Sequence, residues 1–338
     1  MLELKSKSVN ALHKAQDFLA KELLDLENLI KSCFITTSDC LINQIASHLL
    51  FNSKGKMIRP ILTMLFSKML GYQGNSHISL AGAIELIHVA TLLHDDVIDE
   101  SQIRRSALTA QMIWGNKASI LGGDFFFTQA FKLMVKADSL SSLDLLASTT
   151  SSMVKGEIEQ LVNLQNMSLI SKDEYLKIIE YKTGKLFAAS CSVAFLITFS
   201  DKKCDKNRQM LAVVEKFGLL YGLIYQIQDD TADYFNVSTG KQRGKDFTEG
   251  KATLPLIILC EKADKKDLDL IKKTFRIKKR KQDDFDMILY MMDKYAVRKD
   301  LNSHVFELSK QAQYLLSSLD FKNYSQELLF DLVKFISV

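Results

Sequence analysis

Long apolar runs with few breaks dominate the pattern of hydrophobic and polar positions along the 338-residue chain. Residues 81–93 (AGAIELIHVATLL) are apolar on nearly every face of a helix, with Glu85 as the one acidic residue, and residues 211–227 behave similarly. Such helices are typical of the centre of a bundle. Residues 1–30 alternate charged and apolar positions, which predicts an amphipathic helix.

Breaking residues are scarce, and this favours an all-α fold. The chain has two prolines and 14 glycines in a sequence that is 47% hydrophobic, and period-2 alternation bounded by hairpin signals is hard to find. Length alone permits one domain or two, and composition favours one domain over residues 1–338. The apolar stretch at residues 186–199 falls short of the roughly 18 to 20 residues that span a bilayer, so we expect a buried core helix there.

Two acidic clusters of the same form follow two of these runs, at residues 95–99 (DDVID) and 229–233 (DDTAD). On a helix the first and last aspartate of each cluster share a face, and the middle one lies about 100° round as a partner carboxylate. The candidate metal ligands are the six aspartates of the two clusters: Asp95, Asp96, Asp99, Asp229, Asp230 and Asp233.

Carboxylates at the end of a helix face the negative end of its macrodipole and repel one another, so these clusters predict a bound cation. Mg²⁺ fits best, because it prefers a few carboxylates, several waters and substrate phosphates to a closed protein cage. A solvated acidic helix end is the alternative for one cluster alone. The second copy favours two facing metal sites that bind a diphosphate.

Basic residues accompany the acidic clusters and suit a polyanionic substrate, because arginine binds phosphate bidentately and lysine acts as a point charge. Surface ion pairing is the alternative for each one alone. They are Lys56, Arg59, Arg104, Arg105, Lys182, Lys185, Lys241, Lys245 and Lys251. His88 lies two helical turns before Asp95 on the same face, although a lone helical histidine is more often a core residue.

Overall charge and cysteine content exclude several classes of function. The net charge of +4 is small, so nothing indicates a nucleic-acid partner, and residues 272–281 (KKTFRIKKRK) predict a solvated surface, with anionic lipid as the alternative. Five cysteines without CxxC spacing argue against disulfides or a zinc site. The N-terminal segment lacks the pattern of a signal peptide, so we expect a cytoplasmic protein.

Three motifs together resemble the trans-prenyltransferase family, and within it the long-chain polyprenyl diphosphate synthases. They are LLHDDVIDESxxRR around the first acidic cluster, YKTGKL at residues 181–186, and QIQDDxxDY followed by GKxxGKDFxEGKATLPLI around the second. The resemblance covers residues 50–260, in family order and at family spacing. It implies an all-α, single-domain bundle of the isoprenoid synthase type around a deep central cavity, usually a homodimer.

The same resemblance implies roles for individual residues. Asp95 and Asp99, with Asp229 across the cavity, would hold Mg²⁺ on an allylic diphosphate. The residues that match contacts to this diphosphate are Arg104, Lys182, Thr183, Gln226 and Lys241. Those that match contacts to isopentenyl diphosphate are Lys56, Arg59, His88 and Arg105. The predicted catalytic set is Asp95, Asp99, Arg104, Lys182 and Asp229.

The implied reaction is a sequential, Mg²⁺-dependent addition of isopentenyl diphosphate to an allylic diphosphate, with farnesyl diphosphate as the expected primer. Metal and basic residues stabilise the departing diphosphate, the isopentenyl double bond attacks the allylic carbocation, and loss of a proton restores an alkene. An apolar cavity protects the cation from water. We expect the product to serve quinone side-chain synthesis, with peripheral membrane contact for its release.

Product length is expected to depend on the helix before Asp95, because an isoprene unit advances roughly 5 Å and the helical pitch is about 5.4 Å. Short-chain members carry a bulky aromatic residue where this chain has Ala90, which is followed by Thr91. Phe131 and Met134 are candidates for the cavity floor, with core packing as the alternative. By family resemblance we expect octaprenyl diphosphate, and a shorter- or longer-chain synthase stays open.

Departures from the family pattern occur at Met57, where arginine is usual, and at Ser106, Leu108 and Gln111, which replace a usual Gly, Pro and Asn. The second group predicts a different turn after the double arginine.

Two other classes of function remain as alternatives. A non-catalytic partner subunit need not keep both acidic clusters, and a terpene cyclase does not need the residues matched to isopentenyl diphosphate, so the complete set favours a synthase.

Overall fold

The computed structural model describes residues 2–34, 40–52, 55–104, 107–165, 169–199, 204–235, 243–277 and 279–336. Across these ranges helices make up nearly all of the regular structure, and one hairpin of two very short strands is the exception. The all-α prediction is therefore confirmed. The amphipathic pattern of residues 1–30 forms two helices, because the first helix breaks at Leu19.

The end of α8 lies close to the middle of the chain. The first part of the chain contains α1 (Leu2–Phe18), α2 (Ala20–Phe34), α3 (Leu41–Ala46), the π-helix η1 (Ser47–Asn52), α4 (Ile58–Met69), α5 (Ser76–Ile98), β1 (Ile103–Arg104), β2 (Ala107–Leu108), α6 (Ala110–Trp114), α7 (Asn116–Lys136) and α8 (Leu140–Gln165). The second part contains α9 (Lys172–Ile179), the π-helix η2 (Glu180–Gly184), α10 (Lys185–Thr198), α11 (Asp205–Phe235), α12 (Lys245–Glu249), α13 (Leu254–Lys262), α14 (Lys265–Phe275), α15 (Gln282–Lys294), α16 (Val297–Ser317) and α17 (Tyr324–Ile336).

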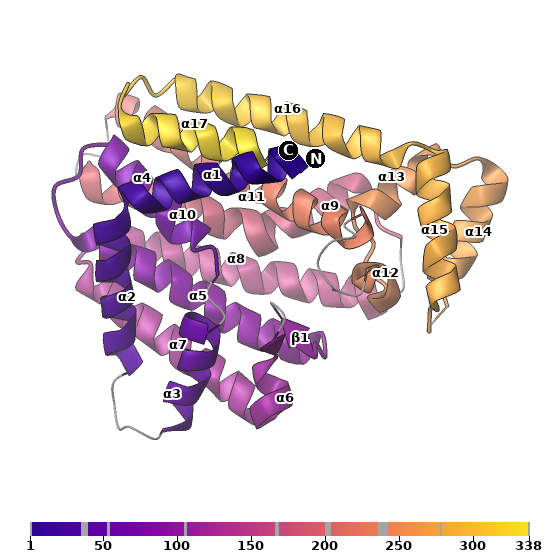
Figure 1. Ribbon diagram of the computed structural model, residues 1–338. Coiled ribbons are helices and arrows are strands. Elements are labelled where there is room, and N and C mark those ends of the chain that lie inside the picture. The colour runs from indigo at the N-terminus through magenta and orange to yellow at the C-terminus, as the bar shows by residue number, and fades with distance from the viewer. Residues whose placement is uncertain are drawn as a thin grey trace.

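Three apolar helices, α5, α10 and α11, pack together at the centre of the bundle (Figure 1). Residues 186–195 of α10 are all buried, as their unbroken apolar run predicts. By length and composition α5 and α11 are apolar enough to cross a membrane, but 72% of the relevant window of α5 is buried inside the protein. For α11 the corresponding share is 44%, so other helices cover most of that window in α5 and less than half of it in α11.

Two hydrophobic clusters form the core, and α11 contributes to both of them. Phe217 and Tyr221 belong to the larger cluster, which includes α4, α5 and α10, whereas Ile227 and Tyr234 belong to the smaller cluster with α13 and α15. α16 and α17 lie with α1 along one side of the bundle, and α14 and α15 extend from its other end (Figure 1). The acidic end of α11 therefore lies next to the smaller cluster.

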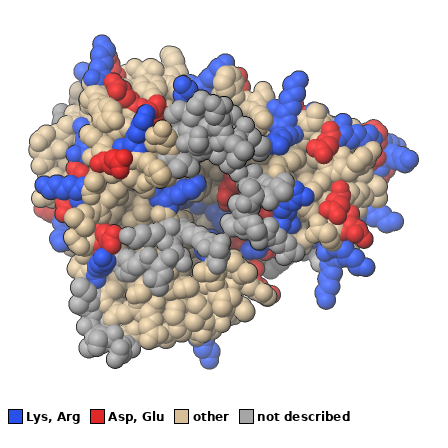
Figure 2. Space-filling view, viewed as in Figure 1, with Lys and Arg blue, Asp and Glu red and all other residues tan. Residues whose placement is uncertain are grey.

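The outer face of α7 and α8 is apolar yet exposed. The large exposed side chains there include Leu121, Phe131, Val135, Val154 and Ile158, with exposed fractions between 49% and 70%. Figure 2 shows an uncharged area at the bottom of the view, where α6 and α7 lie. Phe131 thus does not line an enclosed cavity of a single chain, and its prediction as a cavity floor was wrong. The other candidate, Met134, is buried.

Candidate active site

The end of α5 carries the first acidic cluster. The backbone N–H groups of Glu100 and Ser101 donate to the carbonyls of Val97 and Asp96, at 3.3 and 2.9 Å, and Glu100 has a φ of 48°. This pattern is a Schellman motif, which ends the helix at the last aspartate of the cluster. Asp95 and Asp99 lie on one face of the final turns, as predicted from their spacing.

Asp96 lies between Asp95 and Asp99 in sequence, but its side chain points toward Arg104. Its carboxylate is 1% exposed, and it accepts from Arg104 Nε at 2.8 and 3.1 Å and from Arg104 Nη2 at 2.8 Å. Both oxygens are therefore held by one guanidinium, which suits the partner role expected from its angular position better than metal ligation. Because a guanidinium carries five N–H donors, Arg104 keeps donors for a second anion.

The connection after Arg104 folds back onto the end of α5. Thr109 Oγ1 and Gln111 Nε2 both donate to the carbonyl of Ser101, each at 2.7 Å, and Leu108 pairs with Ile103 in the hairpin. The glutamine that departs from the family pattern thus has a structural role here. Arg105 and Ser106 lie outside the described residues, so their predicted roles stay predictions.

The second acidic cluster lies at the end of α11 and has a different environment. Asp229 is exposed, whereas Asp230 is buried, with hydrogen bonds from Tyr175 and Gln226. The carboxylate of Asp233 accepts from the backbone N–H groups of Lys245 and Asp246, at 3.2 and 3.0 Å. Asp233 therefore fixes the start of α12 against the end of α11.

Lys251, which follows α12, pairs with the first cluster. Its Nζ lies 2.8 Å from Asp99 Oδ2 and 3.0 Å from Glu249 Oε2, and its side chain is 13% exposed. Lys245, at the start of α12, donates to Ser101 Oγ at 2.8 Å. Because α12 is held by Asp233, these contacts bring the ends of α5 and α11 to the same mouth of the bundle.

Lys182 reaches the first cluster from the π-helix η2. Its Nζ lies 2.6 Å from Glu157, 3.0 Å from Gln160 Oε1 and 3.9 Å from Asp95 Oδ2. A Cβ on Gly156 would lie 2.7 Å from the Cβ of Tyr181, so only glycine lets α8 approach η2 this closely. Short π-helical segments occur frequently at functional sites, and this one sets the direction of Lys182.

Thr183, the next residue of η2, contacts α11. Its Oγ1 donates to Gln226 Oε1 at 2.7 Å. A Cβ on Gly222 would lie 2.8 Å from Gly184 Cα, so the absence of side chains at both positions allows the two segments to pack this closely. The structure thus joins Thr183 and Gln226, two residues that the sequence predicted for the same diphosphate.

The pKa values of four buried or half-buried aspartates shift in different directions. Burial raises the pKa of Asp95 to about 6 and that of Asp230 to about 6, and it also raises the pKa of Asp233. Burial acts in the same direction on Asp99, but Lys251 outweighs it and lowers the pKa of that carboxyl. The lysines therefore compensate one aspartate of the four, and the site as a whole is short of positive charge.

The donor set suits a hard divalent cation such as Mg²⁺. Asp95, Asp99 and Asp229 offer carboxylate oxygens that are not all engaged by protein donors. Within the described ranges no three Asp, Glu, His or Cys side chains converge on one point. A few separated carboxylates fit Mg²⁺, which keeps several waters and uses substrate phosphates as further ligands.

Residues predicted for isopentenyl diphosphate lie toward α4 and α10. Arg59 lies in the first turn of α4, with its guanidinium carbon 4.2 Å from the ring centroid of Phe187, and Lys56 is exposed just before that helix. Met57, between them, has a φ of 53° and begins α4 in a left-handed conformation. His88 lies half-buried on α5. Lys241, predicted for the other diphosphate, is outside the described residues.

Sequence reasoning missed several residues that the structure places at this site. Glu157 and Gln160 come from α8, which carries no recognisable motif, and Tyr175 belongs to α9. Glu249 was visible only as part of the GKDFxEGK motif. In sequence Lys251 lies near the second cluster, yet its ion pair is with Asp99 of the first.

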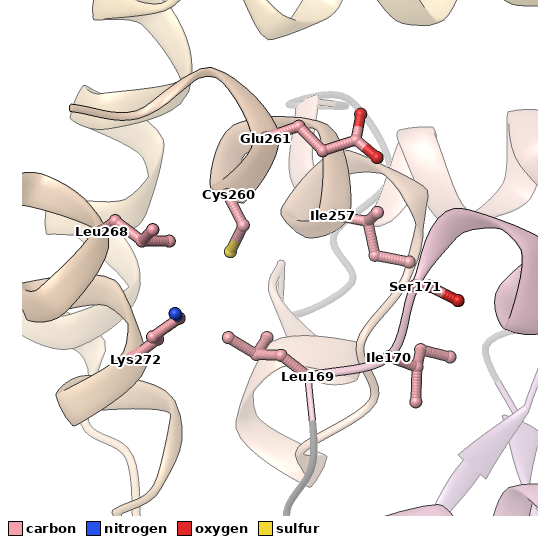
Figure 3. Close-up of a pocket in the computed structure, with 8 residues that line it drawn as sticks. All are labelled: Leu169, Ile170, Ser171, Ile257, Cys260, Glu261, Leu268 and Lys272. Carbon is pink, nitrogen blue, oxygen red and sulfur yellow. The ribbon is translucent and has the colours of Figure 1, made fainter. Parts of the chain in front are cut away.

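In the described part of the chain, one small hollow borders the first acidic cluster and a larger one lies elsewhere. A gap of about 20 Å³ borders Asp96 and Arg104. A larger cavity of about 210 Å³ lies between the start of α9, α13 and α14, with Cys260 and Lys272 pointing into it (Figure 3). None of the predicted site residues lines the larger cavity, so it is separate from the acidic clusters.

The helix before Asp95, on which product length is expected to depend, is α5, and its residues lie on two faces. Ala83, Ile87 and Ala90 are fully buried against neighbouring helices. Thr91 is half-buried and lies on the same side of α5 as His88 and Asp95. Thr91 is therefore the small residue on the face of α5 that carries Asp95. A larger side chain at Ala90 would have to displace packed core residues.

Comparison with known proteins places this chain in one family. A family model described as polyprenyl synthetase matches residues 40–292. The octaprenyl diphosphate synthase of Escherichia coli is 38% identical over 219 residues, which are 64% of this chain and 65% of that protein. The match thus spans slightly less than two thirds of the length of that relative.

Two solved structures share the whole fold. A decaprenyl diphosphate synthase from Rhodobacter capsulatus superposes with a TM-score of 0.88 at 30% identity, covering 96% of this chain and 98% of its own. A polyprenyl synthase from Caulobacter crescentus, complexed with calcium and isoprenyl diphosphate, gives a TM-score of 0.88 at 30% identity, covering 96% of this chain and 97% of its own. The chain belongs to the polyprenyl synthetase family.

Proposed function

We propose that this protein is a long-chain polyprenyl diphosphate synthase that adds isopentenyl diphosphate repeatedly to an allylic diphosphate. One observation carries the proposal: both acidic clusters meet at one mouth, because Asp233 of α11 holds the start of α12, while Lys245 and Lys251 of that segment contact Ser101 and Asp99 at the end of α5. Such a site suits a metal-bound diphosphate, because the metal offsets the carboxylates and the ammonium groups face the phosphate oxygens.

The residues of this chain divide the work of ionising the allylic substrate. Asp95 and Asp99, with Asp229 opposite, would hold Mg²⁺, which as a Lewis acid stabilises the negative charge of the departing diphosphate. Lys182 and Arg104 supply positive charge from the two sides of Asp95 and Asp96. The calcium and isoprenyl diphosphate bound by the Caulobacter relative support a divalent cation at this site.

We propose farnesyl diphosphate as primer and octaprenyl diphosphate as product. We propose that the growing chain runs along the half-buried face of α5, which carries the small Thr91. The Escherichia and Rhodobacter relatives are octaprenyl and decaprenyl diphosphate synthases, so a neighbouring length is the alternative within the family. Lys56, Arg59 and His88 are proposed to bind isopentenyl diphosphate.

The apolar outer face of α7 and α8 is proposed to pair with a second copy of this chain in a homodimer. Its residues Leu121, Val135, Val154 and Ile158 are apolar and 52% to 70% exposed, and exposed apolar patches typically mark interaction surfaces. We further propose a cytoplasmic location, supported by five free cysteines, and use of the product in quinone side chains, with peripheral membrane contact at its release.

A product assay tests the proposed function. Purified protein is incubated with Mg²⁺, labelled isopentenyl diphosphate and farnesyl diphosphate, and the products are resolved by chain length. A ladder that ends at the octaprenyl length supports the proposal, whereas a ladder that ends elsewhere corrects only the length. Failure to extend any allylic primer would favour a non-catalytic partner subunit.

A further inference from the structure

A chain of three short hydrogen bonds connects α9, α11 and η2 behind the second acidic cluster. Tyr175 Oη donates to Asp230 Oδ2, Gln226 Nε2 donates to Asp230 Oδ1, and Thr183 Oγ1 donates to Gln226 Oε1, each at 2.7 Å. Tyr175, Asp230 and Thr183 are 3%, 5% and 6% exposed. Water is therefore largely excluded from Tyr175, Asp230 and Thr183, whereas Gln226 is half-buried.

The carboxylate fixes the direction of the whole chain. An ionised aspartate accepts hydrogen bonds and cannot donate them, so both Tyr175 and the amide nitrogen of Gln226 must donate to Asp230. The amide oxygen of Gln226 then faces Thr183, whose single hydroxyl proton is used in that bond. Thr183 consequently presents only oxygen lone pairs to any group on its other side.

Tyr175 is itself held rigidly at the start of α9. Ser171 and Glu174 form a capping box, in which Ser171 Oγ accepts from the Glu174 N–H at 3.2 Å and Glu174 Oε2 accepts from the Ser171 N–H at 2.8 Å. The backbone N–H of Tyr175 donates to the Ser171 carbonyl at 3.0 Å. The phenol is thus aimed at Asp230 by a helix start of fixed geometry.

We propose that Tyr175 is a positioning residue for the reaction: by holding Asp230 it keeps the neighbouring Asp229 and the lone pairs of the Thr183 hydroxyl oriented toward the metal. This inference rests on the proposed role of Asp229 in holding metal. Tyr175 reaches the site only through Asp230, because its hydroxyl is already engaged with that buried carboxylate. Partners of this kind typically change metal affinity by about 10- to 100-fold when they are removed.

The test measures Mn²⁺ binding to the full chain by electron paramagnetic resonance, with inorganic diphosphate present. Tyr175→Phe removes one oxygen atom and keeps the ring, and it is expected to weaken Mn²⁺ binding about tenfold. Asp230→Asn is expected to weaken binding at least as much. The double variant should bind Mn²⁺ no more weakly than Asp230→Asn alone, because Tyr175 acts through Asp230.

Matched variants separate positioning from general damage. Tyr221→Phe changes another buried tyrosine, located on α11 itself, and should leave Mn²⁺ binding unchanged. Gln226→Leu removes the donor to the other oxygen of Asp230 and should weaken binding to a similar extent as Tyr175→Phe. This second variant gives an independent result should Tyr175→Phe lower the thermal unfolding temperature substantially.

The outcomes distinguish this inference from the proposed function. If Asp229→Asn leaves Mn²⁺ binding intact, the metal role of the second cluster is wrong, and the inference falls with it. If Asp229→Asn weakens binding while Tyr175→Phe and Gln226→Leu do not, only the inference is overturned. An additional loss from Tyr175→Phe in the Asp230→Asn background would show that Tyr175 does not act through Asp230.

Discussion

The two acidic clusters have the same sequence form but opposite surroundings. The cluster at the end of α5 is surrounded by cations, since Arg104, Lys182 and Lys251 each contact one of its aspartates. The cluster at the end of α11 is surrounded by neutral donors, namely the hydroxyl of Tyr175, the amide of Gln226 and two backbone N–H groups.

This difference implies different roles for the clusters at the ends of α5 and α11. The ammonium groups of Lys182 and Lys251 can interact with a diphosphate near the first cluster, because lysine is a point charge on a flexible stem. Neutral donors at the second cluster hold its carboxylates in place without compensating their charge. The second cluster therefore depends more on a bound cation than the first, and substitutions can test that contrast.

The largest expected effect is the loss of turnover when a metal-facing carboxylate is removed from either cluster. Asp95→Ala and Asp229→Ala should each lower kcat by about a thousandfold, because charge stabilisation of the departing diphosphate is lost. Circular dichroism should show that both variants keep their helical content. Asp205→Ala, at the exposed start of α11, is the control. Near-normal turnover in either cluster variant would remove that cluster from the mechanism.

A smaller effect is expected from Lys251→Met, and it should be specific to the first cluster. The substitution leaves Asp99 buried without its cation, which should cost on the order of 3 kcal/mol of unfolding free energy in metal-free buffer. Turnover should fall about a hundredfold. Lys262→Met breaks the exposed pair with Asp300 and should cost less than about 1 kcal/mol. Equal losses in the two variants would contradict a special role for Lys251.

Metal binding should stabilise the protein by a moderate amount that depends on pH. Mg²⁺ at about 100 times its Kd should add about 2.7 kcal/mol to the free energy of unfolding. Because burial raises the pKa of Asp95 to about 6, protons compete with the metal below that pH, and the stabilisation should shrink as pH falls from 7 to 5. Thermal unfolding with and without EDTA measures this. A stabilisation that grows on acidification would contradict the assignment.

The smallest effect on rate, but a visible one on product, is expected from Thr91→Phe. A ring on the half-buried face of α5 would obstruct the growing chain, so the product should shorten while the first condensation continues at a similar rate. Ser303→Phe, at an exposed position of α16, should leave product length unchanged. An unaltered product distribution in Thr91→Phe would place the length-determining surface on another helix.

Local periodicity was sufficient to predict the central helices and the faces of their aspartates. The apolar runs at residues 81–93 and 211–227 lie within α5 and α11, and the run at 186–199 coincides with α10 apart from its last residue and one added at its start. The spacing of Asp95 and Asp99 places both on one face of the last turns. These features depend on residues three or four positions apart, which a sequence displays directly.

Tertiary contacts were not predictable in the same way. Lys251 follows the second cluster in sequence but pairs with Asp99, because the fold of α12 turns it toward the end of α5. Glu157 and Tyr175 reach the site from helices that carry no motif. The apolar neighbours of Phe131 predict a core residue, yet Phe131 lies on the exposed face of α7. Each outcome depends on how helices distant in sequence pack.

The most direct test of a metal-bound diphosphate between the two clusters is a crystal structure of this protein with Mn²⁺ and inorganic diphosphate, in which anomalous scattering locates the metal. We predict Mn²⁺ bound by Asp95 and Asp99 on one side and by Asp229 on the other, with the diphosphate between the metal and Lys182. Anomalous peaks that touch none of these three aspartates would contradict this arrangement.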